Sequence, residues 1–221
     1  MVTIPKTLPV FPISGVIVPP GAVLPFNIFE PRYLAMLEDV LKNGRYIIMA
    51  QPKDGNQGDK SPELYLVATL CKVVFFDEDS PSRYRITVMG MQRIVLEKEL
   101  AMKRGYRRFA FKRKDYLEDL LNDDFHLPDR KNFFSILSLY LQRFKKMIDW
   151  DDFHKLEDEK ILLVVMITFP FLPAEKQALL EAKNAKDRYE LLVALLDMAI
   201  KDYGRFKDAD PWDDNEKIIL Q

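Results

Sequence analysis

The sequence has few of the residues that form disulfides and metal sites. Its 221 residues include one cysteine and two histidines. The cysteine, Cys71, cannot form an internal disulfide and lies within an apolar run, so we expect it to be a small buried side chain. His126 and His154 each stand in charged surroundings, without a second histidine or cysteine at ligand spacing. The sequence therefore predicts no metal site.

Signals for catalysis are also missing. No serine lies in a nucleophile elbow, and adjacent acidic pairs such as Asp151-Asp152 cannot share one face of a helix. The segment from Gly55 to Ser61 has glycines, a lysine and a serine, but their spacing does not fit a phosphate-binding loop. We therefore expect no enzymatic activity and no cofactor.

Long apolar runs and an excess of one charge are absent as well. The longest late apolar run, 161–169, is too short to cross a bilayer. Pro5, Pro9 and Pro12 interrupt the N-terminal segment that would have to be continuously apolar in a signal peptide. The 33 basic and 34 acidic side chains leave no overall attraction to nucleic acid or anionic lipid. The expectation is a cytoplasmic protein that does not bind membranes.

The chain has 14 prolines, and they are concentrated near its start. Because proline cannot donate to a β-ladder, the segment 8–29 predicts short extended pieces with bends at Pro12, at 19–21 and at Pro25. The apolar spacing then changes to three and four. This change predicts a helix over 31–42, with proline in its first turn and Asn43-Gly44 after its end.

The rest of the chain divides by its apolar periodicity. Strands are expected at 45–51, 64–76, 83–89, 92–100 and 106–113, with a turn at 77–82. Helical spacing dominates later, and Asn184 with Asp187 three residues on is typical of a helix start. We therefore expect a β-rich part at 1–114, a helical part at 115–204 and an acidic tail at 205–221.

Three blocks, in order, resemble one protein family. They are LPVFPISG with LPFNIFEPRYLAML, then the strand pair containing VMGMQR, and finally FPFLPAEKQALLEAK. Together they resemble the N-terminal substrate-binding domain of the bacterial Lon protease. The resemblance implies an α+β fold: a PUA-like β pseudo-barrel with one helix, followed by a C-terminal α-helical bundle. The full protease adds an ATPase and a serine-lysine peptidase, and we expect neither within these 221 residues.

The resemblance implies a non-catalytic, proteolysis-related module that binds proteins or peptides. Its partners would be unfolded or hydrophobic protein segments, with a protease as a further partner; it says nothing of the oligomeric state. Such a module needs exposed apolar surface or a free strand edge. The proline-rich start supplies the candidates, whereas Glu30 and Arg32 are assigned to local hydrogen bonds at the helix start. The candidate binding residues are Phe11, Val16, Val18, Leu24, Phe26 and Phe29.

An RNA-binding PUA-like protein is the alternative. The segment 103–114 holds seven basic residues and no acid, interleaved with aromatics, and such strands can stack bases and hold phosphates. Its candidate residues are Arg107, Arg108 and Lys112. The same alternation is typical of any half-buried strand, and we expect the acids from Asp115 onward to offset the charge. Nucleic acid is therefore not the expected partner.

Overall fold

The computed structural model of the protein describes residues 4–53, 61–80, 83–120 and 125–202. It divides into two compact units, Met1–Asn122 and Asp123–Gln221. The sequence predicted the boundary at 114/115. The structure divides the chain after Asn122 because the segment 114–120 is attached to the first unit. The tail 205–221 lies outside the described residues.

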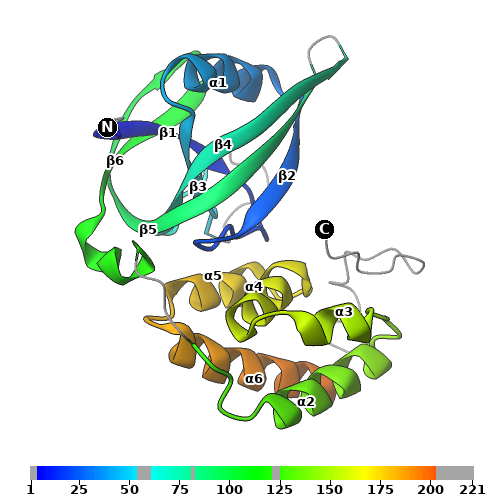
Figure 1. Ribbon diagram of the computed structural model, residues 1–221. Helices are drawn as coiled ribbons and strands as arrows, with labels where there is room; N and C mark the ends of the chain where they lie inside the picture. The colour runs from blue at the N-terminus through cyan, green and yellow to red at the C-terminus, as the bar shows by residue number, and fades with distance from the viewer. Residues whose placement is uncertain (1–3, 54–60, 81–82, 121–124, 203–221) are drawn as a thin grey trace. The chain divides into compact units, whose positions relative to one another are not determined.

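The first unit is a six-stranded sheet with one α-helix and a final 3-10 segment (Figure 1). Its elements are β1 (Thr7–Pro12), β2 (Val23–Ile28), α1 (Pro31–Lys42), β3 (Tyr46–Ala50), β4 (Val67–Ser80), β5 (Arg83–Lys103), β6 (Tyr106–Lys112) and η1 (Lys114–Leu120). The strand order is β2-β5-β4-β3-β1-β6, and β5 also pairs with β6. The second pairing closes five strands into a barrel and leaves β2 as an added strand beside β5.

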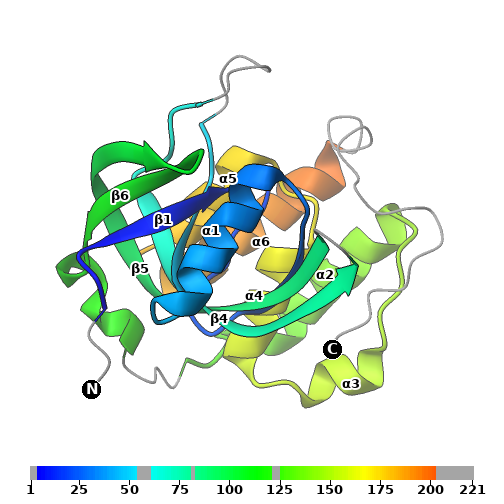
Figure 2. The same cartoon turned by 90° about the horizontal axis from the view of Figure 1, so that it is seen from above.

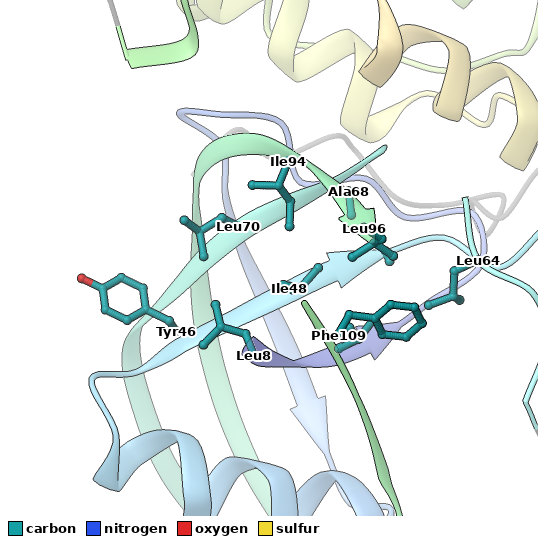
Figure 3. Packing of buried hydrophobic residues seen from close by; sticks show 11 residues of the cluster. Leu8, Tyr46, Ile48, Leu64, Ala68, Leu70, Ile94, Leu96 and Phe109 are labelled. Carbon is teal, nitrogen blue, oxygen red and sulfur yellow. The ribbon is translucent and has the colours of Figure 1, made fainter. Parts of the chain in front are cut away.

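The barrel is filled by inward-pointing side chains that come from strands far apart in the sequence (Figure 3). Ile48 and Leu70 are paired across β3 and β4, and both are fully buried. Phe109 comes from β6 and belongs to the same cluster, which explains why the aromatics of that strand alternate with arginines. The cluster consists of Leu8, Val10, Tyr46, Ile48, Ala50, Leu64, Ala68, Leu70, Ile94, Leu96 and Phe109.

The predicted helix 31–42 is present with the same bounds as α1. Pro31 occupies its first turn, where the missing N–H is not needed. The buried face consists of Tyr33, Met36, Leu37 and Val40. Seen from above, α1 lies across one opening of the curled sheet (Figure 2).

The two strands predicted at 83–89 and 92–100 form one strand, β5. Gly90 lies inside β5, at the point where the segment that contains Pro19 passes close to this strand. A Cβ at Gly90 would stand 2.2 Å from the carbonyl oxygen of Pro19, so no larger residue fits without a backbone shift. The glycine therefore marks a close backbone approach and not a break in the strand.

η1 belongs to the first unit because of a buried ion pair. Arg93 of β5, which is 1% exposed, donates from Nη2 to Asp119 Oδ1 at 2.7 Å, and its own backbone N–H donates to Oδ2 at 2.7 Å. The guanidinium also stacks over the Tyr116 ring at 4.3 Å. These contacts attach η1 to the barrel, so the helical unit starts after it.

The second unit contains five helices in its described residues. They are α2 (Arg130–Arg143), α3 (Trp150–Lys155), α4 (Asp158–Thr168), α5 (Pro173–Glu181) and α6 (Ala185–Lys201). The helix start predicted at Asn184 is confirmed, since Asn184 Oδ1 accepts the Asp187 N–H at 2.8 Å. In the described part of the chain, no helix is both long and apolar enough to cross a membrane.

The predicted fold class is confirmed. A mixed sheet curled into a barrel, with one α-helix beside it, precedes a helical region in the chain. One predicted detail is wrong: Pro25 does not bend the chain but lies inside β2, opposite Thr87.

Candidate binding surface

The six candidate residues from the proline-rich segment do not share one environment. Phe11 and Val18 are buried, and Phe11 packs edge-on against Phe26 with ring centroids 5.9 Å apart. Val16, Leu24 and Phe26 are half-buried. Phe29 alone among the six is plainly exposed, at 61%. Within this set, only Phe29 offers a large open apolar surface.

Strands β2, β5 and β4 form a three-stranded flank that has a buried and an open face. Pairing places Phe26 opposite Ile86, and Leu24 opposite Val88. Because Ile86 and Val88 are buried, Leu24 and Phe26 lie on the inward face. The residues between them occupy the opposite, outward face.

The outward face carries apolar side chains in adjacent rows. Pro25, Thr87 and Phe75 are paired across the three strands in one row. Val23 and Met89 are paired in the next row, which Lys72 of β4 completes. Val23 is 54% exposed and Phe75 is 52% exposed. The result is an apolar surface, here called the flank patch and defined by Val23, Pro25, Phe75, Thr87 and Met89.

Sequence reasoning missed Phe75 because the run 73–76 reads as a continuously buried strand. The pairing is shifted between Val73 and Phe75, so the chain bulges there. Phe76 then lies on the face of Ile86 and is covered in part by the Arg45 guanidinium, 5.3 Å from its ring centroid. Phe75 is left on the open face. The lack of alternation in this run was the one available signal.

The outer edge of β2 is open along the described strands, and proline limits what can pair with it. The Gly90 N–H donates to the Ala22 carbonyl at 2.9 Å, so this carbonyl points to β5. Every second residue after Ala22 repeats this direction, and the residues between point to the open edge. Pro25 is one of those between, and it has no N–H to offer. The edge is therefore a poor template for a long added strand.

Two of the three basic residues of β6 are paired with acids of β5, whereas the Nε of the third, Arg108, is buried and has no hydrogen-bond partner in the described residues. Arg107 makes two hydrogen bonds to Glu99, of 2.6 and 2.9 Å, and a third of 2.6 Å to the Pro62 carbonyl. Lys112 is exposed and lies 2.7 Å from Glu97. We expected the offsetting charge from Asp115 onward, whereas the paired acids lie on the neighbouring strand. Phe109 lies in the buried barrel cluster and Phe111 is partly buried against it, so these two rings do not form an open stacking surface.

A cluster of ion pairs and one hydrogen bond joins the β5–β6 turn to α1. Tyr106 donates its hydroxyl proton to Asp39 Oδ2 at 2.6 Å, and Arg104 pairs with Glu38 at 2.7 Å. The Tyr106 hydrogen bond, together with Lys103 nearby, lowers the pKa of Asp39, and burial raises the pKa of Tyr106. These are structural contacts between neighbouring elements.

The described residues offer neither a metal-binding cluster nor a reactive cysteine. They contain no group of three or more histidine, cysteine or acidic side chains that could hold a metal ion. Cys71 is fully buried, and burial raises the pKa of its thiol far above the ordinary value, so the reactive thiolate does not form.

The chain matches the family model described as the ATP-dependent protease La (LON) substrate-binding domain over residues 7–198. It belongs to this family. The Lon protease of Desulfovibrio desulfuricans is 32% identical over 94 residues, which are 42% of this chain and 11% of that protein. The Lon protease of Buchnera aphidicola is 22% identical over 205 residues, covering 88% of this chain and 25% of that protein. The chain thus spans a quarter or less of these two relatives.

Solved structures of the LON family share the fold. One is a Lon N-terminal domain protein from Xanthomonas campestris, with a TM-score of 0.60, 18% identity, and 85% of this chain and 97% of that chain covered. Another is the N-terminal domain of Mycobacterium avium complex Lon protease, with a TM-score of 0.61, 15% identity, and 87% and 98% covered. The match over nearly the whole of both chains confirms the resemblance found in the sequence.

Proposed function

We propose that the protein is a non-catalytic binding module that captures exposed hydrophobic segments of other proteins through the flank patch. Membership of the LON substrate-binding family supports the class of ligand. The cytoplasm is the expected place of action, and delivery of the captured protein to a protease is the expected outcome.

The observation that carries the proposal is the exposure of Phe75 and Val23 on the outward face of a paired sheet. Single exposed apolar residues are common on proteins, but cross-strand rows of them on an open face mark an interaction surface. The face is supported from behind by Ile86 and Val88, which are fully buried. A rigid apolar face of this kind accepts many sequences because it requires no particular hydrogen-bonding side chain.

Side-chain contact with this face is favoured over strand addition at its edge. Pro25 removes a backbone donor from the open edge of β2. The edge can therefore make few of the main-chain hydrogen bonds on which strand addition depends. Phe29 is exposed directly after β2, but the polar row of Asn27, Arg85 and Asp77 separates it from the flank patch.

The test is a titration of the protein with a permanently unfolded, reduced and alkylated model protein. We expect roughly micromolar affinity, because a modest interface must also meet the cost of ordering a flexible chain. Replacing Val23 and Phe75 together by serine should weaken binding about tenfold or more, since aromatic anchors dominate such contacts.

The matched control is Met198→Ser, which removes a comparably exposed apolar side chain from α6 in the other unit. It should leave affinity unchanged. Equal affinity of the wild type and the Val23→Ser, Phe75→Ser variant, with both proteins folded by circular dichroism, would rule out the flank patch as the binding surface.

A further inference from the structure

The first unit also contains a cleft that is separate from the flank patch. Its volume is about 660 Å³, within the range of small-ligand sites. Among the described residues, its lining comes from β1, the first turn of α1, Pro52 with Ser61 and Pro62, and the β5–β6 turn with its flanking residues. None of the five residues of the flank patch lines it.

The walls are mostly apolar and stiff. Pro12, Pro52 and Pro62 contribute rings that have no N–H, and Met102 adds a flexible exposed side chain. Gly105 has a φ of +86°, and a Cβ there would come within 3.4 Å of the Arg32 Cβ. The tight turn at Gly105 therefore brings β6 against the start of α1 and shapes the cleft.

The Tyr33 hydroxyl is a donor at this cleft that makes no hydrogen bond to the described residues. Tyr33 lines the cleft and is 7% exposed. Its ring is fixed by Phe11, with centroids 4.6 Å apart, and by the Arg32 guanidinium 4.5 Å above it. Burial is the main reason that the pKa of Tyr33 is raised, so the group stays a neutral donor. The buried side-chain atoms without a partner do not include this hydroxyl, so it is open to the cleft and is available to donate to a bound ligand.

Arg32 supplies a second set of donors to the same cleft. Its Nε donates to Glu30 at 2.9 Å, while the two terminal nitrogens have no partner among the described residues. Glu30 is the N-cap residue of α1, but its side chain makes no capping hydrogen bond and accepts from Arg32 instead. Arg107, the other arginine of the cleft, is occupied by Glu99 and Pro62. The free donors are thus the Arg32 fork and the Tyr33 hydroxyl.

We propose that this cleft binds a peptide carboxylate that is flanked by an apolar side chain. The planar fork of an arginine matches the two oxygens of a carboxylate, and a phenol donates a further hydrogen bond to one of them. The proline rings and Met102 then cover the adjacent apolar side chain. A single available fork with Glu30 and Glu99 nearby suits one negative charge better than a phosphate dianion.

The carboxylate has two sources, a chain terminus or an acidic side chain, and three peptides separate them. All are pentapeptides with an uncharged BODIPY label and a terminal phenylalanine, which follows a leucine in the first two and an aspartate in the third. The first has a free C-terminus, the second is amidated, and the third is amidated with an aspartate before the phenylalanine. Fluorescence anisotropy should detect the first or the third, and the amidated second peptide should bind at least about tenfold more weakly.

Two variants test the residues. Tyr33→Phe removes only the hydroxyl, which has no partner in the protein, so folding should be unaffected while affinity for the carboxylate peptide falls severalfold. Arg32→Met should lower that affinity about tenfold or more. Arg85→Met is the matched control, since Arg85 is similarly exposed, lies 3.7 Å from Asp77 and does not line the cleft.

The proposal builds on peptide binding as the proposed function, but its failure is distinguishable. The Val23→Ser, Phe75→Ser variant should bind the carboxylate peptide normally and the unfolded protein weakly, and Tyr33→Phe should still bind the alkylated unfolded chain through the flank patch. The carboxylate assignment is overturned if the amidated peptide binds as tightly as the acids. It is equally overturned if Tyr33→Phe and Arg32→Met bind like the wild type, or if inorganic phosphate competes at the concentration of the peptide.

Discussion

Lys176 of α5 shows how one buried residue sets a pH dependence. Its side chain is buried, and its ammonium donates to the Ile167 carbonyl at 3.2 Å. Burial, which disfavours the charged form, lowers the pKa of Lys176 to about 8 from an ordinary value of 10.5. Between these two pH values the unfolded chain holds the proton and the folded protein has lost it. The free energy of unfolding should therefore increase, through this residue, as pH rises from about 8 to 10.5. Below that window the folded protein bears the full cost of burying the charge.

We predict that Lys176→Met stabilises the protein at pH 7 and that this advantage shrinks by about 2 kcal/mol at pH 9.5. Urea unfolding of both proteins at the two pH values measures it, and the difference between them cancels the other titrating groups. Lys155→Met, at an exposed position of α3, serves as the control and should show no such change. An advantage of equal size at both pH values would contradict the lowered pKa.

At the scale of single residues, features that depend on neighbours in the sequence could be predicted. Contacts between residues far apart in the sequence could not. The helix cap at Asn184 could be predicted, because asparagine is a preferred N-cap residue and Asp187 follows three residues later. The buried state of Cys71 was likewise expected from its apolar neighbours. The unpartnered hydroxyl of Tyr33 could not be foreseen, because it depends on the cleft that the β5–β6 turn makes with α1.

At the scale of elements, the buried pair of Arg93 and Asp119 decides where the first unit ends. Both side chains are nearly buried, and they join β5 to η1 across a long stretch of sequence. Sequence periodicity does not encode this pairing, which is why the boundary was expected at 114/115. An isolated arginine in a strand gives no sign of which acid it will meet.

We predict that Asp119→Ala costs about 3–5 kcal/mol of unfolding free energy, because it leaves the Arg93 charge buried without its carboxylate. The double change Arg93→Met, Asp119→Leu should cost clearly less, since both charges leave together. Denaturant midpoints measure both variants. Asp152→Ala, which breaks only the exposed pair with Lys155, should not move the midpoint. If Asp119→Ala behaved like this control, the ion pair would not be what anchors η1.

At the scale of the whole molecule, the order of strands and helices could be predicted and the binding surface only in part. The helix 31–42 and the helical region follow from local spacing, and the barrel follows from the family resemblance. The continuity of β5 through Gly90 could not be predicted, because it depends on the crossing segment at Pro19. Likewise Phe75 reaches the open face only through a bulge in the register between β4 and β5.

The final prediction separates capture of apolar segments from RNA binding by its response to salt. Affinity for the unfolded model protein should change less than about threefold between 50 and 500 mM salt, since burial of apolar surface is not screened. Three phosphate contacts to a single strand would instead lose about 100-fold over that range. Arg108→Ala with Lys112→Ala should leave protein capture unchanged, because Lys112 is already paired with Glu97. Tight, salt-sensitive binding of single-stranded RNA, abolished by those two changes, would make RNA the ligand and remove the basis for the flank patch as the functional surface.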